Sequence, residues 1–439
     1  MKPLIRNILL PFHEYLKGHT TLKMLAGLER TQWMRPEELQ QLQEQKYDAI
    51  VEFVQEHVPF YRDLLKSQSD KTQLPYLRKN AIRDNIKKMC SKKAERLVRS
   101  NTGGSTGEPL VFYLGKRRIS ADVAAKMRAT KWWGVDIGDR EVVIWGSPVE
   151  LTRQDRIRAF RDRLFRTKLL SAFDMTEETM LEYLNFMIEF KPLHIFGYPS
   201  SISLLCKYAR EKNIRLDDIG VKVIFCTAER LYDEQRQLIS AVFSAPVANG
   251  YGGRDSGFIA HECPEGRMHV TDENMMVEIV DSAGNVLKPG ERGEIVITHL
   301  ESHDFPFIRY KTGDVGVKSD EMCSCGRGLS ILKAVEGRST DFIVTPDGRI
   351  MHGLALIYVV RETEGIEEFK IVQEDYDRID LFLSVNELFS EKHAAGIKKG
   401  FSKRLGAAVD VTIHCVDKIP PDKSGKYRYV ESKVQQLYS

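Results

Sequence analysis

The sequence has few cysteines, only short apolar runs and little net charge, and each of these three features excludes a class of function or location. Seven cysteines are spread unevenly over 439 residues, which argues against a disulfide framework and favours a reducing compartment, so a cytoplasmic protein is expected. The longest apolar run, Leu354 to Val360, is far too short to cross a bilayer. The formal net charge of +3 gives no support for a nucleic-acid partner.

The first residues also lack a complete targeting signal. The apolar stretch at the start is interrupted by Arg6 and Asn7, and no small-residue cleavage site follows it. We therefore expect neither a signal peptide nor a transmembrane segment.

The chain does have enough apolar material for a large core, because 42% of its 439 residues are hydrophobic, and it is too long for one compact domain. Residues 1–99 have mostly helical patterns, and a long amphipathic one begins at Pro36. Residues 100–337 alternate between strand-like and helix-like runs, which predicts a layered α/β core. Residues 338–439 combine strands with one or two helices and are expected to form a small α+β domain. The strand-like runs are 141–145, 192–196, 221–226 and 294–298, and the helix-like runs are 120–133, 176–190, 200–212 and 232–243.

A loop rich in glycine and hydroxyl side chains lies at residues 100–109. Glycine lets the backbone approach a ligand closely, and hydroxyls with free N–H groups form a nest for anionic oxygens. No Lys-Ser or Lys-Thr follows the last glycine, so the loop is not that of a P-loop NTPase. The pattern favours a phosphate cradle between two strands, and a plain polar hairpin loop is the alternative.

Residues 103–107 of this loop also match the G-x-S-x-G elbow of serine hydrolases. That elbow needs a helix directly after it, whereas here Pro109 and β-forming residues follow. A hydrolase that uses Ser105 as its nucleophile therefore stays a less favoured hypothesis.

Two local stretches are strongly basic, at residues 78–99 and 153–168. Each is compatible with a solvated helix face. The alternative is a surface for a phosphorylated, acidic or membrane-linked substrate.

Short loops follow three of the expected strands, at residues 196–200, 227–230 and 249–257. In α/β sheets, ligands bind at the carboxyl ends of the strands. These loops are therefore candidates for one shared binding site.

Five motifs, taken together, resemble those of the adenylate-forming (ANL) superfamily of acyl- and aryl-CoA ligases, and they occur in the same order. They lie at 100–109, 249–257, 309–315, 337–341 and 424–426. Over more than 300 residues the chain is similar to the phenylacetate–CoA ligase family, and within it to the CapK-like branch linked to capsule and exopolysaccharide synthesis. The Glu-Cys-Pro-Glu run at 262–265, the Cys-x-Cys-Gly-Arg run at 323–327 and the short C-terminal domain add to this similarity.

The resemblance implies a fold and a reaction. The fold is a large α/β domain with a small, mobile C-terminal lid. In the reaction a carboxylic acid attacks the α-phosphate of ATP in the presence of Mg²⁺, which gives an acyl-adenylate and pyrophosphate, and a second nucleophile, usually the thiol of coenzyme A, then displaces AMP. Catalysis of this kind depends mainly on positioning and charge neutralisation.

The resemblance also implies which residues bind the nucleotide. Tyr251 matches the aromatic residue beside the adenine, and Ala228 and Glu229 match the segment that lines the adenine and the acyl carboxylate. Asp314 matches the carboxylate that binds both ribose hydroxyls, and Arg338 matches an arginine that contacts ribose or phosphate. The β- and γ-phosphates would be held by Thr102, Gly103, Gly104, Ser105, Thr106 and Gly107.

Asp255 matches the family's acidic residue that helps to hold Mg²⁺, a hard cation that takes carboxylate oxygens. The family usually has Glu there, and since Asp is one methylene shorter, direct and water-mediated coordination both stay open. Arg254 beside it fits either a phosphate contact or one half of an ion pair. The acyl pocket would be lined by Gly197, Tyr198, Pro199 and Gly252.

Lys426, in a Ser-Gly-Lys turn of the small domain, matches the lysine that bridges the carboxylate and the α-phosphate during adenylation. Lys423 is its rival. The hinge position of the family is normally Asp or Lys but is Thr340 here, so the hinge is either shifted to Asp341 or altered in its rotation.

Three cysteines and one histidine, in two separate parts of the sequence, provide the four ligands that a closed tetrahedral zinc site requires. They are Cys263, His269, Cys323 and Cys325. The spacing is loose, so buried thiols without metal are the alternative. Related proteins of the branch sometimes carry such a site, so the resemblance supports zinc and leaves metal-free thiols open. No general base or open position is evident, so a zinc ion bound here is interpreted as structural. His261 could replace His269.

The function that these features favour is an ATP-dependent ligase that makes an acyl-CoA. A second hypothesis is an adenylating enzyme that acylates an amine or a sugar of a surface polysaccharide precursor without CoA. A non-catalytic descendant is a further alternative, suggested by Asp255 and Thr340. The sequence determines neither the identity of the acid nor whether the protein forms a homodimer.

Overall fold

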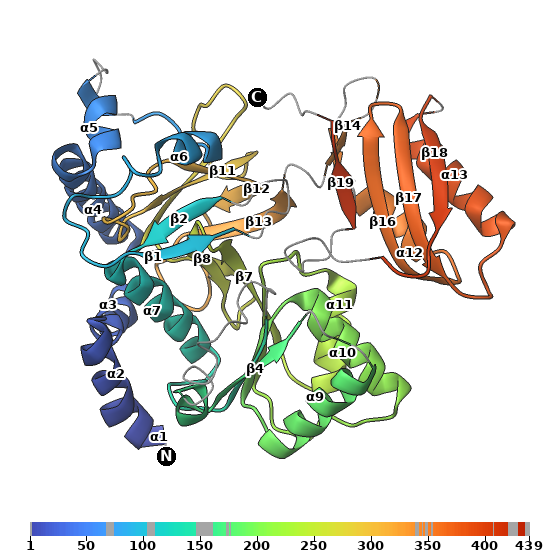
Figure 1. Cartoon of the computed structure of the whole chain (residues 1–439), viewed down its shortest axis with the longest axis horizontal. Helices are drawn as coiled ribbons and strands as arrows, with labels where there is room; N and C mark the ends of the chain where they lie inside the picture. Colours follow the sequence, from blue (N-terminus) through green and yellow to red (C-terminus); the bar gives the residue numbers. More distant parts are fainter. Residues whose placement is uncertain are drawn as a thin grey trace. The chain divides into compact units, whose positions relative to one another are not determined.

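The computed structural model describes residues 2–66, 74–102, 110–145, 161–172, 175, 177–338, 342–344, 346, 350–352, 354–406, 408–419 and 429–434. The chain divides into two compact units (Figure 1). One unit comprises Met1–Thr312 and Gly316–Val335, and the other comprises Gly313–Val315 and Glu336–Ser439. The large unit is mixed α/β and the second unit is α+β, which is the predicted fold class.

Helices dominate the start of the large unit. They are α1 (Lys2–Leu4), η1 (Ile5–Leu9), α2 (Leu10–Lys17), α3 (Thr21–Thr31), α4 (Pro36–His57), α5 (Pro59–Lys66) and α6 (Lys79–Asn85). Helix α4 begins at Pro36, since proline at the first helical position has a suitable φ and lacks an N–H that would otherwise be unsatisfied. It buries Leu39, Ile50 and Val54 and ends before Pro59, as its apolar periodicity predicts.

The large unit is built on one 11-stranded sheet with the order β10-β11-β12-β13-β9-β8-β7-β6-β5-β3-β4. Strands β4, β3, β5, β6 and β7 are parallel to one another, whereas β8 and β9 are antiparallel to their neighbours. The strands are β3 (Glu141–Trp145), β4 (Thr167–Ser171), β5 (His194–Gly197), β6 (Val223–Thr227), β7 (Val247–Gly253), β8 (Gly257–Glu262), β9 (Met268–Val270), β10 (Met275–Val280), β11 (Arg292–His299), β12 (Tyr310–Ser319) and β13 (Ile331–Arg338).

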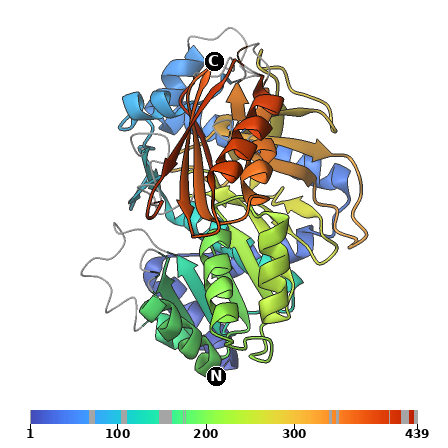
Figure 2. The ribbon, with the colours of Figure 1, turned by 90° about the vertical axis from the view of Figure 1, so that its right-hand side faces the viewer.

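Helices α9 (Glu177–Phe190), α10 (Pro199–Glu211) and α11 (Asp233–Phe243) lie together on one face of the parallel strands (Figures 1 and 2). Between them and the sheet lie fully buried side chains, among them Leu184, Ile195, Ile202, Ile224 and Ile239. Helix α7 (Lys116–Trp132) instead contacts α3 and β8. The bounds of all four helices lie within a few residues of the predicted ones, because the apolar residues that a helix buries recur with the helical period.

The second unit has a four-stranded sheet with the order β18-β17-β16-β19 and a separate pair formed by β14 and β15. Its helices α12 (Leu354–Arg361) and α13 (Glu391–Leu405) contact each other and the larger sheet. Ile371, Leu381, Ile397 and Phe401 are fully buried in its core. The strands are β14 (Phe342–Val344), β15 (Ile350–His352), β16 (Ile366–Asp375), β17 (Arg378–Val385), β18 (Asp410–Cys415) and β19 (Val430–Ser432).

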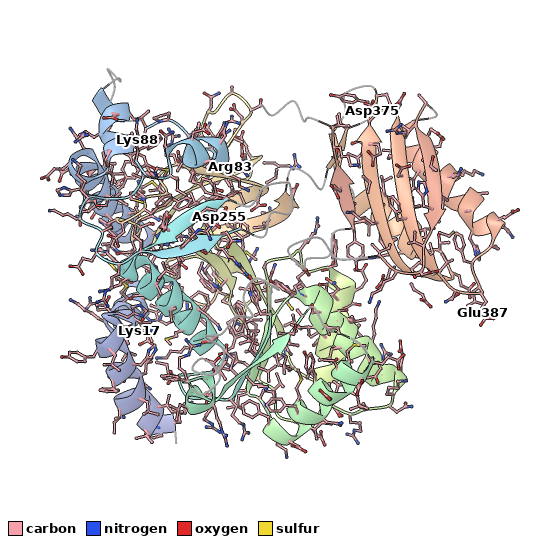
Figure 3. The ribbon with its side chains drawn as sticks, viewed as in Figure 1. Lys17, Arg83, Lys88, Asp255, Asp375 and Glu387 are labelled. Atoms are coloured by element: carbon pink, nitrogen blue, oxygen red, sulfur yellow. The ribbon has the colours of Figure 1, made fainter. Side chains whose placement is uncertain are left out.

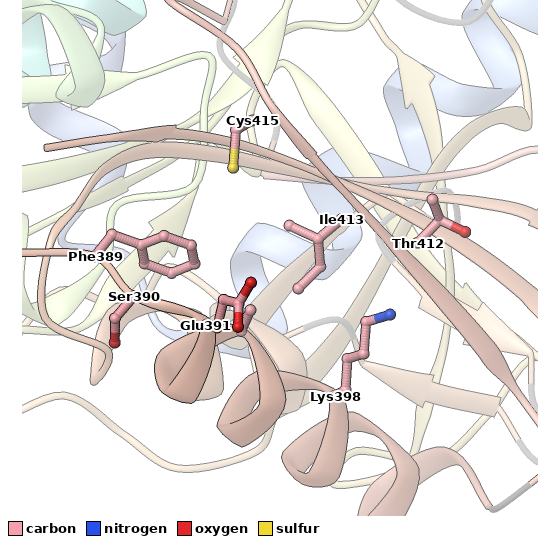
Figure 4. Close-up of a pocket in the computed structure, with 8 residues that line it drawn as sticks. Phe389, Ser390, Glu391, Lys398, Thr412, Ile413 and Cys415 are labelled. Atoms are coloured by element: carbon pink, nitrogen blue, oxygen red, sulfur yellow. The ribbon is translucent and has the colours of Figure 1, made fainter.

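A pocket opens beside the start of α13 in the second unit (Figure 4). Phe389, Ile413 and Cys415 supply its apolar and sulfur atoms, and Glu391 and Lys398 supply its charges. None of the residues that line it belongs to the predicted site.

Candidate functional site

The carboxyl ends of β5, β6 and β7 bring the three predicted loops to one edge of the sheet. Gly197 at the end of β5 pairs in register with Cys226 of β6, and Thr227 pairs with Gly250 of β7. The Thr227 hydroxyl also donates a hydrogen bond of 2.8 Å to the Gly250 carbonyl. Residues that are separated by about 30 positions in sequence are thus adjacent at the edge where parallel sheets bind ligands.

The end of β5 has a tightly packed backbone. A Cβ atom at Gly197 would lie 2.5 Å from the carbonyl oxygen of Ile144, so the close approach of β3 requires glycine. Tyr198, only 2% exposed, stacks on Trp145 with 4.2 Å between ring centroids. Pro199 then opens α10. This aromatic wall is compatible with the acyl pocket predicted for residues 197–199.

The end of β6 turns sharply and presents a carboxylate. Ala228 has a positive φ of 68°, an uncommon conformation for a residue with a side chain. The next residue, Glu229, accepts a hydrogen bond of 3.2 Å at Oε2 from the backbone N–H of Ser200. Since Ser200 lies in the first turn of α10, the carboxylate of Glu229 is placed at the positive end of that helix.

The end of β7 carries the predicted adenine contact. The Tyr251 hydroxyl lies 3.4 Å from Thr312 Oγ1, and its ring is half-buried. The register with β8 shifts between Tyr251 and Gly252. A Cβ at Gly252 would lie 2.3 Å from the carbonyl of Gly257, so this irregularity requires glycine.

Asp255, labelled in Figure 3, follows this strand, and its carboxylate accepts two hydrogen bonds. Tyr310 donates its hydroxyl proton to Oδ2 at 2.7 Å, and the N–H of Ser256 donates to Oδ1 at 3.1 Å. A carboxylate has about four acceptor positions, so acceptor capacity remains for a cation or its water. The residue is partly exposed, which also fits the predicted role near Mg²⁺.

Arg118 of α7 supports this segment and is absent from the sequence-based prediction. Its side chain is 1% exposed, and its Nη2 donates to the carbonyl of Asp255 at 2.6 Å. The guanidinium lies 5.0 Å from the ring centroid of Phe307 and 5.9 Å from that of Phe112. Among the described residues, no hydrogen-bond acceptor meets its Nε or Nη1. In the sequence it sits in a Lys-Arg-Arg run that resembles a solvated helix start, so no local signal distinguished it.

The charge of Arg118 is balanced by Asp122, one helical turn later. Arg118 Nε lies 3.6 Å from Asp122 Oδ2, and His299 Nε2 lies 3.3 Å from Oδ1. Burial alone would raise the pKa of the Asp122 carboxyl, but His299 and Arg118 more than offset this and hold the pKa below its ordinary value. The carboxylate is therefore charged at neutral pH.

The glycine-rich loop is flanked by two strands, β1 (Val98–Asn101) and β2 (Val111–Leu114), which pair antiparallel. At the mouth of the loop Thr102 N–H donates to the Leu110 carbonyl at 3.0 Å, and Leu110 N–H donates to Thr102 Oγ1 at 2.9 Å. A strand follows the loop, as predicted for a phosphate cradle, whereas the hydrolase elbow requires a helix. Gly103, Gly104, Ser105, Thr106 and Gly107 themselves lie outside the described residues.

The remaining nucleotide residues lie near or beyond the boundary between the units. Asp314 is in β12, within the short segment that belongs to the second unit, and Arg338 ends the neighbouring strand β13. Thr340 and Asp341 of the expected hinge lie outside the described residues, as do Lys423 and Lys426. Their assignments stay predictions.

The four predicted zinc ligands are brought together in the large unit. One donor atom from each of the four residues lies within 4.8 Å of the others. Cys263 Sγ is 3.7 Å from Cys323 Sγ, and Cys325 Sγ is 3.3 Å from His269 Nε2. The other ring nitrogen of His269 lies 3.2 Å from the carbonyl oxygen of Leu329, so that carbonyl is placed to fix the orientation of the ring. His261, the alternative ligand, is outside this group and stacks on Phe258.

None of the helices in the described parts of the chain is both long and apolar enough to cross a bilayer.

Comparisons with known proteins agree with this geometry. Residues 343–433 match the family model of the CapK C-terminal domain. Protein CapK of Staphylococcus aureus is 26% identical over 411 residues, which cover 91% of this chain and 90% of the relative. The resemblance to the CapK-like branch of the adenylate-forming enzymes is confirmed.

The phenylacetate–CoA ligases are similar to this chain over a comparable length. The phenylacetate-coenzyme A ligase of Thermus thermophilus is 23% identical over 435 residues, covering 90% of this chain and 96% of the relative. A solved 2-hydroxyisobutyryl-CoA ligase, crystallised in the postadenylation state, aligns with a TM-score of 0.71 and 19% identity over 92% of both chains. The fold is thus that of the adenylate-forming CoA ligases.

Proposed function

We propose that the protein adenylates a carboxylic acid with ATP and transfers the acyl group to the thiol of coenzyme A. The observation that carries this proposal is the convergence of residues 197–199, 227–229 and 250–255 at one edge of the sheet, in a chain with the fold of acid–CoA ligases. The acid carboxylate attacks the α-phosphorus and pyrophosphate leaves. The CoA thiolate then attacks the acyl carbon and AMP leaves.

Each group of the site has a distinct task in this proposal. The loop at 102–107 holds the β- and γ-phosphates, Tyr251 lies against the adenine, and Asp314 binds the ribose hydroxyls. Lys426 neutralises the charge that builds up between the acid and the α-phosphate. Mg²⁺ would supply further charge neutralisation at the phosphates, and the partly exposed carboxylate of Asp255 suits such a hard cation.

A second acceptor class is favoured by the similarity to Protein CapK and by the matching C-terminal domain. In this version the same acyl-adenylate forms, but an amine or a sugar hydroxyl attacks the acyl carbon in place of the thiol. Both versions share the adenylation step and differ only in the nucleophile that releases AMP.

The decisive measurement is a screen for pyrophosphate release over aryl, aliphatic and amino acids, with and without CoA. We expect at least one acid to trigger release, and CoA to raise turnover because it discharges the bound adenylate. Release without acceleration by CoA would favour an amine or sugar acceptor. If no acid of the three classes triggers release while ATP still binds, the ligase proposal fails and a non-catalytic descendant takes its place.

We also propose that Cys263, His269, Cys323 and Cys325 hold one structural zinc ion. Two of the donor separations, 3.7 Å between the sulfurs of Cys263 and Cys323 and 3.3 Å between Cys325 Sγ and His269 Nε2, approach the edge of about 3.8 Å expected for a tetrahedron with Zn–S bonds of ~2.3 Å. Four protein donors close the coordination sphere and leave no open position for substrate. Zinc here would tie the β8–β9 hairpin to the loop at 323–328.

Purified protein is expected to contain one zinc ion per chain, and Cys323→Ser to contain none. We expect this variant to lower the midpoint of thermal unfolding by about 5 °C or more, because each kcal/mol lost corresponds to roughly 2–4 °C in a domain of this order of size. Cys415→Ser, at an exposed cysteine of the second unit, is the control and should keep both metal and midpoint. Elemental analysis that finds no zinc in the wild-type chain would refute the site.

A further inference from the structure

The N-terminal helical segment carries an unusual outward face. Helices α1 and α2 are joined through η1 by residues that keep right-handed helical dihedrals, so residues 2–17 form one continuous helical segment. Large apolar side chains spaced three or four residues apart lie exposed along it, with exposures of 45% to 83%. These residues, here called the α2 stripe, are Leu4, Ile8, Phe12, Tyr15 and Leu16.

The stripe is not the face that packs on the protein. That face contains Ile5, Leu10 and Glu14, which are buried. A helix on the surface of a globular protein normally turns polar side chains outward, and a contiguous exposed apolar patch marks an interaction site. Both faces of this segment are therefore occupied by apolar residues, one against the core and one against solvent.

The charge around the stripe is positive. The only acidic residue between positions 2 and 23 is Glu14, and its carboxylate is turned inward, where it accepts hydrogen bonds from the N–H groups of Thr21 at 2.6 Å and Leu22 at 3.2 Å. Lys17 is exposed at the end of this segment, and Lys23 is exposed in the following helix α3 (Figure 3 labels Lys17). Burial lowers the pKa of His13, and the nearby charges of Arg161 and Lys17 lower it further.

The described part of the second basic stretch, residues 161–168, contacts α2. The ring of Phe165 contacts that of His13 with 5.6 Å between centroids. Leu164 is 41% exposed there and Arg163 is exposed as well. Arg161 pairs with Asp162 at 2.6 Å, and the Lys168 ammonium lies 5.4 Å from the ring centroid of Phe186 on α9. Arg163 and Leu164 thus add a cation and an apolar side chain to the stretch that contacts α2.

The segment is fixed to the body of the large unit. Lys2 forms an ion pair of 2.7 Å with Asp139, and Arg6 forms one of 2.9 Å with Asp136. Both carboxylates lie in the turn after α7, so the helix is presented at the edge of the unit as a fixed surface (Figure 1).

We propose that the α2 stripe and residues 161–168 together dock the protein on an anionic lipid membrane. An interfacial helix of this kind places its apolar side chains at the boundary of headgroups and acyl chains, and nearby lysines and arginines bind the lipid phosphates. A second copy of the chain fits less well, because a symmetric contact through this surface would bring its cations against one another. The membrane offers both the apolar layer and the opposite charge.

The test is sedimentation of the full chain with vesicles of phosphatidylcholine, alone or mixed with phosphatidylglycerol. The wild type should bind the anionic vesicles, and more weakly in high salt, and should not bind phosphatidylcholine alone. The double variant Ile8→Glu/Phe12→Glu should lose at least about tenfold in apparent affinity, because charged side chains do not enter the apolar layer. These positions are 58% and 60% exposed, so the fold is preserved, which circular dichroism checks.

The matched control places the same charges on another exposed apolar face. Leu181 and Ile188 of α9 are 41% and 36% exposed, and Leu181→Glu/Ile188→Glu should bind vesicles like the wild type. Wild-type protein that stays in the supernatant with anionic vesicles would overturn the proposal, as would equal losses in the two double variants. A dimer in sedimentation velocity that dissociates only in Ile8→Glu/Phe12→Glu would assign the stripe to a second copy and overturn it too.

Discussion

Replacing Lys426 by alanine is expected to lower acid-dependent pyrophosphate release by about a hundredfold or more, which corresponds to the roughly 3 kcal/mol that one preorganised charge contributes to such a transition state. Negative charge builds up where the carboxylate joins the α-phosphate, and an ammonium on a flexible stem is suited to bridge the two groups. Binding of ATP should remain close to that of the wild type, because most nucleotide contacts come from other residues. Single-turnover release of pyrophosphate and calorimetric titration with ATP measure the two effects separately.

Lys423 provides the matched control, since it lies three positions earlier in the same Pro-Asp-Lys-Ser-Gly-Lys segment. Lys423→Ala should change pyrophosphate release by less than about threefold, as expected for a lysine that makes no contact in the transition state. The reverse order of the two losses would transfer the catalytic role to Lys423. Full activity in both variants would show that neither Lys423 nor Lys426 is needed for this step.

The strands and helices of the parallel part of the sheet could be predicted because the side chains that they bury form regular apolar patterns in the sequence. The strand predicted at 141–145 has the observed bounds of β3, and the helix predicted at 232–243 differs from α11 by one residue at its start. Parallel strands that are covered on both faces appear as short apolar runs, and the helices that cover them keep their apolar residues on one face. Placing the candidate loops at strand ends then required only the rule for α/β sheets.

Contacts between distant residues could not be predicted in this way. The Asp255 carboxylate is held by Tyr310, 55 positions away, and the Asp255 carbonyl is held by Arg118, 137 positions away. Arg118 belongs to no motif and sits in a run that resembles an exposed helix start. Tyr310 lies within the motif at 309–315, but neither its position there nor its neighbours indicated a contact with Asp255. The choice of His269 over His261 in the metal group likewise depended on which ring faces the cysteines.

The motif resemblance contributed a different kind of information. Local sequence alone describes Lys426 as a loop lysine and Asp314 as a turn aspartate, and only their order along the chain relates them to a nucleotide site. The relatives found by comparison are of the kind that this order indicates, while the individual roles await the experiments proposed for them.

Asp255→Asn is expected to reduce pyrophosphate release by about a hundredfold and to raise the Mg²⁺ concentration needed for half-maximal rate. The amide keeps the size of the carboxylate but loses the charge that attracts a hard cation, directly or through water, and such charge stabilisation is worth a few kcal/mol. A magnesium titration of the single-turnover rate separates weaker metal binding from a slower chemical step. An unchanged magnesium dependence would contradict the assignment of Asp255.

Two further substitutions distinguish charge from position at this carboxylate. Tyr310→Phe removes the hydroxyl that donates to Oδ2 at 2.7 Å and leaves the charge in place, so we expect a loss of about tenfold at most, the effect of one hydrogen bond to a charged group. Asp255→Glu introduces the longer acidic side chain that is usual at this position in the family that the chain resembles. If Asp255 coordinates Mg²⁺ directly, the longer carboxylate must displace Tyr310 and slow the reaction; if it acts through a water, Glu takes the place of that water and the rate is retained or raised.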